Sequence, residues 1–486
     1  MSLATLIPKP KSVTETHEGP FFITEADRVQ SEGADGLQAV VRRVSEALKL
    51  GDVTTSEDGR IQLVLNEPGA GESTPESGAA EAYTLKITPD LVTLSASSEK
   101  GLHRGSETLA QLLVEGDLGE KMLPACVIED EPRYGWRGLS MDVSRTFYPV
   151  EEIQGLIDLL SLYRMNTLHL HLSDDQGWRL EVQELPKLTS ISGKTAGEGN
   201  RAGFYTTRDF ENIVQYAADR GIDVIAEFDI PGHTNAATHA YGELTPSGEP
   251  TAAYGGSKVG FSVLYPDVPF TDTFLDDIFT TAAKSSSSPY VHIGGDEALE
   301  QPKDQYDQLI EKAAAVVTGA GKKPVAWQEA ASAELPDGAV LQWWRPQEDP
   351  AQVVKAAGEG AKVLMSPAPH AYLDLKYDAE TPYGQDWAGF VELKDSYNWD
   401  PATTIEGVED ADVIGVEAGM WTEYIRNYEQ LMYMLLPRIP ALAEVAWTEQ
   451  EDRDYDDFTS RIGDHPKYWN ARGLKWHASP GVNWQD

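Results

Sequence analysis

The stretch that decides the fold is Tyr290–Glu300, which reads YVHIGGDEALE. Its first four residues have the β-branched and aromatic side chains of a buried strand, and the two glycines loosen the backbone where that strand should end. Two adjacent carboxylates, Asp296 and Glu297, follow at once. Holding both ionised is costly, so one of them should keep its proton near neutral pH, as a general acid requires. Acidic residues also favour helix starts, so the pair alone leaves a structural role open.

The same pattern, a short apolar run that ends in polar residues, recurs on both sides of this stretch. Eight such runs follow Arg137, with amphipathic helical segments between most of them: RGLSMDV, TLHLHL, IDVIAEF, YVHIGG, PVAWQ, VLQWW, KVLMS and VIGVEA. Eight alternating strand and helix units predict an α/β fold of the (β/α)8 TIM-barrel type. An open doubly wound sheet is the alternative. No glycine-rich phosphate loop follows the first run, which gives a nucleotide-binding enzyme little support.

The segment before the barrel has a different character. Residues up to about 130 combine short alternating strands with two helical segments, and they show no cluster of histidine, carboxylate and aromatic residues. We therefore expect a small non-catalytic α+β domain at residues 1–130. The catalytic barrel, including C-terminal helices, should occupy residues 131–486.

The composition narrows the classes of function and partner. The formal net charge is -40, which argues against a nucleic acid or an anionic membrane as partner. The single cysteine, Cys126, excludes an intrachain disulfide and a cysteine-based metal site. No apolar run reaches the length of a membrane span, and the first residues lack the features of a signal peptide. We expect a cytoplasmic monomer or homodimer, or a secreted one if a leader has been removed.

In a (β/α)8 barrel the active site lies at the carboxyl ends of the strands. Most of the predicted strands end in carboxylates, histidines or tryptophans, namely Asp142 and Arg145; His169, His171, Asp174 and Asp175; Glu227, Asp229 and His233; Asp296 and Glu297; Trp327 and Glu329; Trp343 and Trp344; and Trp421 and Glu423. Flat apolar rings beside carboxylates suit a sugar, because the rings stack on its C–H face while charged groups bind its hydroxyls. A small carbohydrate substrate is therefore expected, with no cofactor.

These motifs resemble glycoside hydrolase family 20, the β-N-acetylhexosaminidases. The matching segments run in order from Arg137 to about Trp447: RGLSMDVSRTF, NTLHLHLSDDQGWRLEV, EFDIPGHTNAA, HIGGDE, AWQE, LQWW, YLDLKY and VEAGMWTE. HIGGDE and PGHTNAA are the most specific, and LIPKPKSV resembles the opening of the family's N-terminal domain. The resemblance implies a barrel preceded by a small α+β domain. It also implies a retaining exo-enzyme that removes terminal β-linked GlcNAc or GalNAc.

The resemblance implies unequal roles for the adjacent carboxylates. An ordinary retaining glycosidase sets an acid and a nucleophile about 5 Å apart on opposite sides of the anomeric carbon, which neighbours in sequence are poorly placed to do. Family 20 is known for substrate assistance, in which the 2-acetamido oxygen attacks C1 and forms an oxazolinium intermediate. By resemblance, Glu297 is the general acid and base, and Asp296 orients the acetamide and balances the developing positive charge.

Five polar residues receive roles from the same resemblance. Arg137 should donate to the C3 and C4 hydroxyls of the sugar, a task that suits a forked guanidinium. Asp374 and Glu423 should contact hydroxyls at the far end of the sugar. Asp174 and His233 should set the protonation of the general acid.

Five aromatic residues complete the site that the resemblance implies. Trp327, Trp344 and Trp421 should wall the acetamide group and the sugar ring, and Trp344 is chosen over its neighbour because an arginine follows it, as in relatives. Tyr372 should donate its hydroxyl to the acetamide oxygen. Trp399, in a long loop over the pocket, should line the site of the leaving group.

Two other classes of protein remain open. His169 and His171 lie on one face of a strand, and with His233, His292 and Asp296 they could bind a divalent ion in a metal-dependent hydrolase. The histidines run into SDDQGW, as in the hexosaminidases, and this favours the glycosidase without a metal. A catalytically inactive sugar-binding protein is the third possibility, and the intact catalytic motif argues against it.

Overall fold

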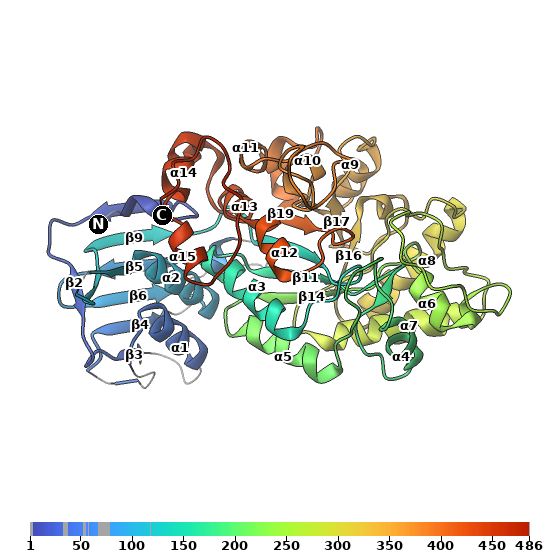
Figure 1. The fold of residues 1–486 in the computed structure, drawn as a ribbon, viewed down its shortest axis with the longest axis horizontal. Helices are drawn as coiled ribbons and strands as arrows, with labels where there is room; N and C mark the ends of the chain where they lie inside the picture. The colour runs from blue at the N-terminus through green and yellow to red at the C-terminus, as the bar shows by residue number, and fades with distance from the viewer. Residues whose placement is uncertain are drawn as a thin grey trace.

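The computed structural model describes residues 3–32, 37–51, 55–56, 58–66, 78–116 and 118–485. The chain forms two adjoining bodies along its longest axis, a smaller one built from the N-terminal residues and a larger barrel (Figure 1). Within the described ranges, no helix has both the length and the apolar character needed to cross a membrane.

The smaller body is a sheet covered on one face by two helices. Its six strands lie in the order β1-β9-β5-β6-β4-β3, and β2, β8 and β7 form a separate small sheet. Side chains of β5 and β6 alternate between buried and more exposed, so one face meets the helices and the other faces outward. The elements are β1 (Ser12–Glu15), β2 (Phe21–Ile23), β3 (Val29–Glu32), α1 (Gln38–Ala47), β4 (Ile61–Leu65), β5 (Tyr83–Ile87), β6 (Val92–Ala96), α2 (Glu99–Leu112), β7 (Val114–Glu115), β8 (Lys121–Leu123) and β9 (Cys126–Asp130).

The larger body is a closed barrel of parallel strands, in which the last strand pairs with the first. The predicted α/β fold with a TIM barrel is confirmed, and each of the eight apolar runs contributes one strand. These strands are β10 (Trp136–Asp142), β11 (Thr167–His171), β14 (Asp223–Glu227), β15 (Tyr290–His292), β16 (Lys323–Trp327), β17 (Val340–Trp343), β18 (Lys362–Met365) and β19 (Val413–Met420).

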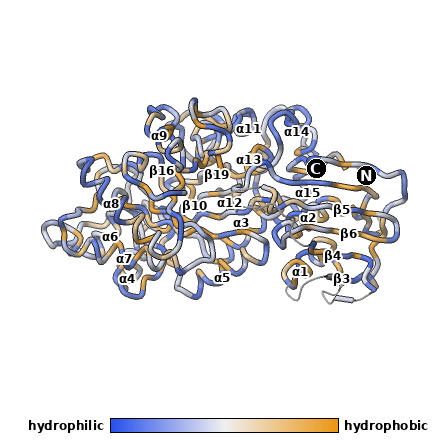
Figure 2. The backbone as a smooth tube through the Cα atoms, turned by 180° about the vertical axis from the view of Figure 1, so that it is seen from behind, coloured by the Kyte–Doolittle hydropathy of each residue, from blue (hydrophilic) through white to orange (hydrophobic). Residues whose placement is uncertain are grey.

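Helices surround the barrel because each carries an apolar stripe that packs on the strands. In α5, for example, Phe210, Ile213 and Ala217 are buried at helical spacing, and Thr206 and Asp209 form a capping box at its start. Hydrophobic and hydrophilic residues alternate along the chain, and many connecting loops are hydrophilic (Figure 2). The helices are α3 (Val150–Leu162), α4 (Lys187–Ser192), α5 (Thr207–Ala218), α6 (Asn235–Ala240), α7 (Phe270–Ser285), α8 (Lys303–Gly319), α9 (Ala351–Gly358), α10 (Ala368–Ala371), α11 (Leu393–Tyr397), α12 (Tyr428–Leu435), α13 (Arg438–Trp447), α14 (Tyr455–Ile462) and α15 (Pro466–Asn470), and a hairpin of β12 (Ser173–Asp174) and β13 (Gly177–Trp178) follows β11.

Buried ion pairs join the two bodies at the amino end of the barrel. Asp130 of β9 accepts hydrogen bonds from Arg164 at 2.7 Å and from the indole of Trp447 at 2.9 Å. Glu81 accepts from Arg137 of β10 at 2.5 Å, and Arg137 and its neighbour Arg104 hold the pKa of this buried carboxyl down at about 2, against the effect of burial. The smaller body therefore neutralises charges that the barrel buries.

Candidate active site

A pocket of about 270 Å³ opens at the carboxyl ends of the barrel strands. Eight residues predicted for the site line it: Asp174, His233, Asp296, Glu297, Trp344, Tyr372, Trp421 and Glu423. A cleft of about 400 Å³ beside α5 and α7 is larger, but no histidine, tyrosine or tryptophan is among its described lining residues. Convergent polar groups and aromatic walls mark the smaller pocket as the functional one.

Asp296 and Glu297 stand on a tight turn that requires glycine. Gly294 and Gly295, just after β15, have φ angles of +73° and +114°, which L side chains rarely adopt. A Cβ atom at Gly294 would lie 1.8 Å from Oδ1 of Asp229, and the Gly295 N–H donates to the same oxygen at 3.0 Å. The turn thus projects both adjacent carboxylates from one strand end into the pocket.

Asp296 lies beside a second buried carboxyl group, that of Asp229. Burial and the charge of Asp296 raise the pKa of Asp229 well above its ordinary value, and burial also raises the pKa of Asp296. Asp229 Oδ2 and Asp296 Oδ1 receive no hydrogen bond from a conventional donor among the described residues. Burial and like charge therefore favour a proton at this pair of carboxyl groups, and the shift is stronger for Asp229 than for Asp296.

Glu297 faces His233, which in turn faces Asp174. His233 Nε2 lies 3.6 Å from both Glu297 Oε2 and Asp296 Oδ2, and His233 Nδ1 lies 3.1 Å from Asp174 Oδ1. Burial disfavours a charged imidazole, but Asp174 and Asp296 nevertheless raise the pKa of His233 well above its ordinary value.

The ionisation of Glu297 follows from its neighbours. Burial works to raise its pKa, but the hydrogen bond and charge of His233, together with the charge of Arg345 at 3.3 Å, lower the pKa overall. The adjacent carboxylates thus differ, since the pKa of Asp296 is raised and that of Glu297 is lowered. The lowered pKa of Glu297 and the raised pKa of His233 favour an ionised carboxylate beside a protonated imidazole.

The rings of Trp344, Tyr372 and Trp421 line the pocket, and the ring of Trp327 packs against Trp421 without being part of the described lining. The rings of Trp344 and Tyr372 are parallel, with centroids 5.9 Å apart, and Trp421 lies 6.0 Å from Tyr372 and 5.8 Å from Trp327. Trp327 is buried below the others, in the same small apolar cluster. Trp343, the neighbour of Trp344, packs into the main barrel core instead. The structure thus brings the three predicted tryptophans and Tyr372 together.

Polar groups gather beside this aromatic wall. Arg145, which follows β10, lies 2.7 Å from Asp174 Oδ2 and 3.9 Å from Glu423 Oε1. Asp374 is fully buried, and neither of its carboxylate oxygens accepts a hydrogen bond from the described residues. Burial raises the pKa of both Asp374 and Glu423. A buried carboxyl group without a hydrogen-bond donor, such as that of Asp374, favours a ligand that supplies hydroxyl groups.

Arg137 lies at the opposite end of the barrel, so the prediction that it binds sugar hydroxyls is wrong. It is the second residue of β10, and its buried guanidinium donates to Glu81 and to the backbone carbonyls of Tyr134 and Arg164. Parallel barrel strands present only their carboxyl ends to the pocket, and Arg137 stands at the amino end. Arg145, just beyond the carboxyl end of the same strand, is the arginine of the pocket. The direction of β10 could have shown from the sequence that Arg145, rather than Arg137, stands at the carboxyl end of the strand.

Trp399 also lies away from the pocket, so its predicted contact with the leaving group is wrong. Its indole stacks on His370 at 5.4 Å and donates to the Ser396 carbonyl, because the second half of the long loop folds back as an ordered, packed segment. Trp387, earlier in that loop, lines the pocket and is 45 % exposed. Val259, in a glycine-containing insertion with no assigned role, lines it as well. Only loop conformation, which the residue pattern does not encode, distinguishes the two tryptophans.

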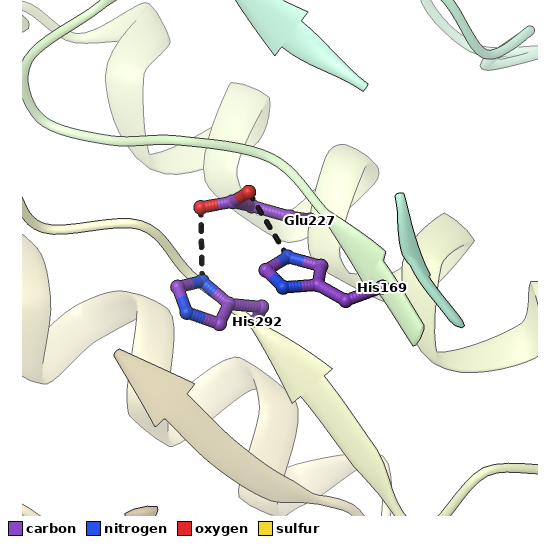
Figure 3. A group of neighbouring side chains, drawn as sticks. All are labelled: His169, Glu227 and His292. Atoms are coloured by element: carbon purple, nitrogen blue, oxygen red, sulfur yellow. Dashed lines mark ion pairs between the residues drawn. The ribbon is translucent and has the colours of Figure 1, made fainter. Parts of the chain in front are cut away.

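A buried cluster lies beneath the pocket, where a metal-dependent hydrolase could have held an ion (Figure 3). Glu227 lies 3.0 Å from Nε2 of His169 and 3.0 Å from Nδ1 of His292, and it also accepts from Trp327 at 2.9 Å. Ligands of tetrahedral zinc, each about 2.0–2.1 Å from the metal, would stand about 3.3–3.4 Å apart. The observed separations are shorter than this, so we interpret the cluster as side chains in direct polar contact rather than as ligands of an ion.

Comparisons with known proteins agree on one family over nearly the whole chain. The family model "Glycosyl hydrolase family 20, catalytic domain" matches residues 134–308 and 298–450, and the model "Glycosyl hydrolase family 20, domain 2" matches residues 4–131. A β-N-acetylhexosaminidase of Cellulomonas fimi is 46% identical over 488 residues, which cover 99% of this chain and 97% of that protein.

Solved structures show the same similarity in three dimensions. The N-acetyl-β-hexosaminidase of Streptomyces plicatus, in complex with Thio-NAglucal, has a TM-score of 0.93 at 37% identity and covers 100% of this chain and 98% of its own. The family 20 β-N-acetylhexosaminidase of Streptomyces coelicolor has a TM-score of 0.93 at 36% identity, with coverage of 100% and 99%. A mutant of the S. plicatus protein, also with a TM-score of 0.93, was solved with the product GlcNAc.

Proposed function

Because the chain belongs to glycosyl hydrolase family 20, we propose that this β-N-acetylhexosaminidase removes terminal, non-reducing, β-linked GlcNAc or GalNAc by substrate-assisted catalysis with retention of configuration. The printed descriptions of its relatives support the amino-sugar substrate, since one of them holds GlcNAc as product. We further propose residues 131–486 as the catalytic domain and residues 1–130 as a supporting domain, which accords with the family matches on either side of residue 131.

One observation carries the mechanism: Asp296 and Glu297 approach the pocket from the same side. Both carboxylates lie 3.6 Å from the same nitrogen of His233. A nucleophile and an acid on opposite faces of the anomeric carbon need a different arrangement. A nucleophile supplied by the substrate resolves this, because the 2-acetamido oxygen can attack C1 while Asp296 faces the acetamide nitrogen.

The pKa shifts of Glu297 and of the groups around it support its role as the general acid. The raised pKa of His233 favours a proton on its imidazole, whose Nε2 faces Glu297 Oε2. Transfer across this contact places the proton on the carboxyl that donates to the leaving oxygen. Glu297 then accepts a proton from the water that opens the oxazolinium ring. Asp296, kept charged by a proton on Asp229, stabilises the positive charge of that ring.

The remaining residues bind the sugar. Trp344 and Trp421, with Trp327 beneath them, enclose the acetamide, and Tyr372 donates its hydroxyl to the acetamide oxygen. Arg145, in place of Arg137, donates to the C3 and C4 hydroxyls of the sugar. Asp374 and Glu423 accept from hydroxyls at the far end of the ring. The leaving sugar then meets Trp387 at the mouth of the pocket.

A panel of three nitrophenyl β-glycosides tests the proposal. The GlcNAc and GalNAc glycosides should be hydrolysed, and the glucose analogue, which has a 2-hydroxyl group in place of the acetamide, should be inert. NMR should show the β-anomer as the first product. Hydrolysis of the glucoside at a comparable rate would contradict an acetamide nucleophile. Loss of activity in chelator together with stoichiometric zinc would favour a metal hydrolase instead.

A further inference from the structure

A chain of alternating carboxylate and imidazole groups runs through the barrel interior to the general acid. In order from the interior its members are Glu417, His169, Glu227, His171, Asp174, His233 and Glu297, which we call the ladder. Successive nitrogen–oxygen distances are 2.9, 3.0, 2.5, 2.9, 3.1 and 3.6 Å. Only the last contact exceeds ordinary hydrogen-bond length. The ladder thus extends three carboxylates and two imidazoles deeper than His233, its one member that touches Glu297 directly.

The ladder occupies space that barrels of this type usually fill with branched apolar side chains. Its middle part is shown in Figure 3, where Glu227 of β14 contacts His169 of the neighbouring strand β11. His171 is paired in register with Glu227, and Glu227 with His292 of β15, so these groups lie in one layer. All of them are buried. A buried polar layer costs desolvation energy that apolar residues would avoid, so it calls for an explanation beyond packing.

The ladder also concentrates charge. Burial opposes a charged imidazole, yet the carboxylates on either side raise the pKa of His169 to about 9 and that of His171 to about 10. Glu227, despite burial, has its pKa held well below the ordinary value by the histidines around it. His292 also contacts Glu227, but burial lowers its pKa, so it is a neutral branch of the ladder. Charged imidazoles and carboxylates therefore alternate from the interior to the pocket.

Asp174 is the point where the ladder meets the site. Its Oδ2 lies 2.9 Å from His171 and 2.7 Å from Arg145, and its Oδ1 faces His233. His171 and Arg145 thus hold one oxygen of the Asp174 carboxylate in place. The other oxygen of the same carboxylate orients His233. The other ionisable groups around these members are Asp142, Asp175, Asp229, His292, Asp296, Arg345 and Glu423.

We propose that His171 and Glu227 are positioning residues for the reaction: through Asp174 and His233 they hold the partner of Glu297 in place and set how tightly the acid binds its proton. The proposal rests on the proposed role of Glu297. Neither residue touches the sugar. Their influence is electrostatic and passes along the hydrogen bonds, so it should appear in the pH dependence rather than only in the rate.

The charge of each ladder member predicts the sign of its effect. His171→Gln removes a positive charge from beside Asp174, so the protonated acid becomes more favourable and the basic midpoint of kcat/KM should rise by about one pH unit. His171→Gln/Glu227→Gln removes one positive and one negative charge, and its midpoint should return close to that of the wild type. His292→Gln is the matched control, because it breaks an equally buried contact to Glu227 without changing the charge. Its midpoint should not move.

The experiment records kcat/KM against pH for the nitrophenyl GlcNAc glycoside with the full-length wild type and the three variants. Thermal unfolding checks that each variant is folded. A His171→Gln midpoint equal to that of His292→Gln would overturn the proposal. A midpoint of the double variant that lies further from the wild-type value than that of His171→Gln would do the same. If the wild type is inactive on this glycoside, the proposed function fails instead. If the wild type is active and the midpoint of His171→Gln does not shift, the proposed function stands and only the proposed role of the ladder is refuted.

A measurement on the wild type covers the case in which His171→Gln does not fold. Nitrogen NMR of the histidine-labelled protein at pH 8 should show at least three imidazole rings with both nitrogens protonated, since His169, His171 and His233 are paired with carboxylates. An unperturbed histidine, with a pKa of about 6.5, is neutral at that pH. Fewer than three protonated rings would mean that the ladder carries no such charge, and the proposal would be refuted.

Discussion

Replacing Asp296 with Asn tests whether the negative charge of this residue stabilises the acetamide group during the reaction. The substitution keeps the size of the side chain and a hydrogen-bond acceptor but removes the negative charge. A cation already approaches this carboxylate closely, since His233 Nε2 lies 3.6 Å from Oδ2. A unit charge at that distance contributes about 4 to 5 kcal/mol at an effective dielectric constant of 20. If the oxazolinium ring approaches as closely, kcat should fall about a thousandfold.

The assay uses the nitrophenyl GlcNAc glycoside, whose leaving group needs little help from an acid, so the loss reports on Asp296. Asp175→Asn is a matched control: Asp175 is equally buried nearby, but its Oδ1 accepts from Ser262 and from the Asn235 backbone rather than facing the pocket. Its kcat should change less than about tenfold. An Asp296→Asn protein with the unfolding temperature and kcat of the wild type would refute the assigned role.

Five further substitutions, four of them in contrasting pairs, have distinct expected outcomes. Glu297→Gln should reduce kcat by a factor of about 10² to 10⁴ on an unactivated disaccharide and far less on the nitrophenyl glycoside, and equal losses would exclude a general acid. Arg145→Met should raise KM and lower kcat, whereas Arg137→Met should cost about 3 to 5 kcal/mol of unfolding free energy in denaturant titration and leave the kinetics of the folded fraction intact. Trp387→Ala should weaken kcat/KM for a disaccharide about tenfold, while Trp399→Ala should only lower the unfolding temperature.

The barrel could be predicted because its signal is repeated. Each strand is a short apolar run, and each is followed by residues that only a carboxyl end places together. Asp296, Glu297 and Trp344 follow their strands within a few residues, so the direction of the strand alone puts them at the pocket. Arg137 shows how this inference fails when direction is ignored. At roughly 3.3 Å per residue, the seven residues of its strand separate the two ends by about 20 Å.

Other parts of the site depend on contacts that no local pattern specifies. Trp387 and Trp399 belong to one loop and have similar neighbours in sequence, yet only the folded loop decides which of them faces the pocket. The ionisation of Glu297 depends on Arg345 and His233, which come from different strands. The motifs identified the residues that carry the chemistry. Which of these residues favour the protonated form could be inferred only from the three-dimensional arrangement.

Glu81 of the N-terminal body accepts from Arg137, Arg104 and Asn166 at the amino end of the barrel. Shortening the gene to the barrel alone would remove Glu81 and leave Arg137 as a charge without its counterion in a dry interior. Such a fragment should aggregate or be degraded rather than work as a smaller enzyme. The N-terminal body, none of whose described residues lines the pocket, should thus be inherited with the catalytic residues as a single folding unit.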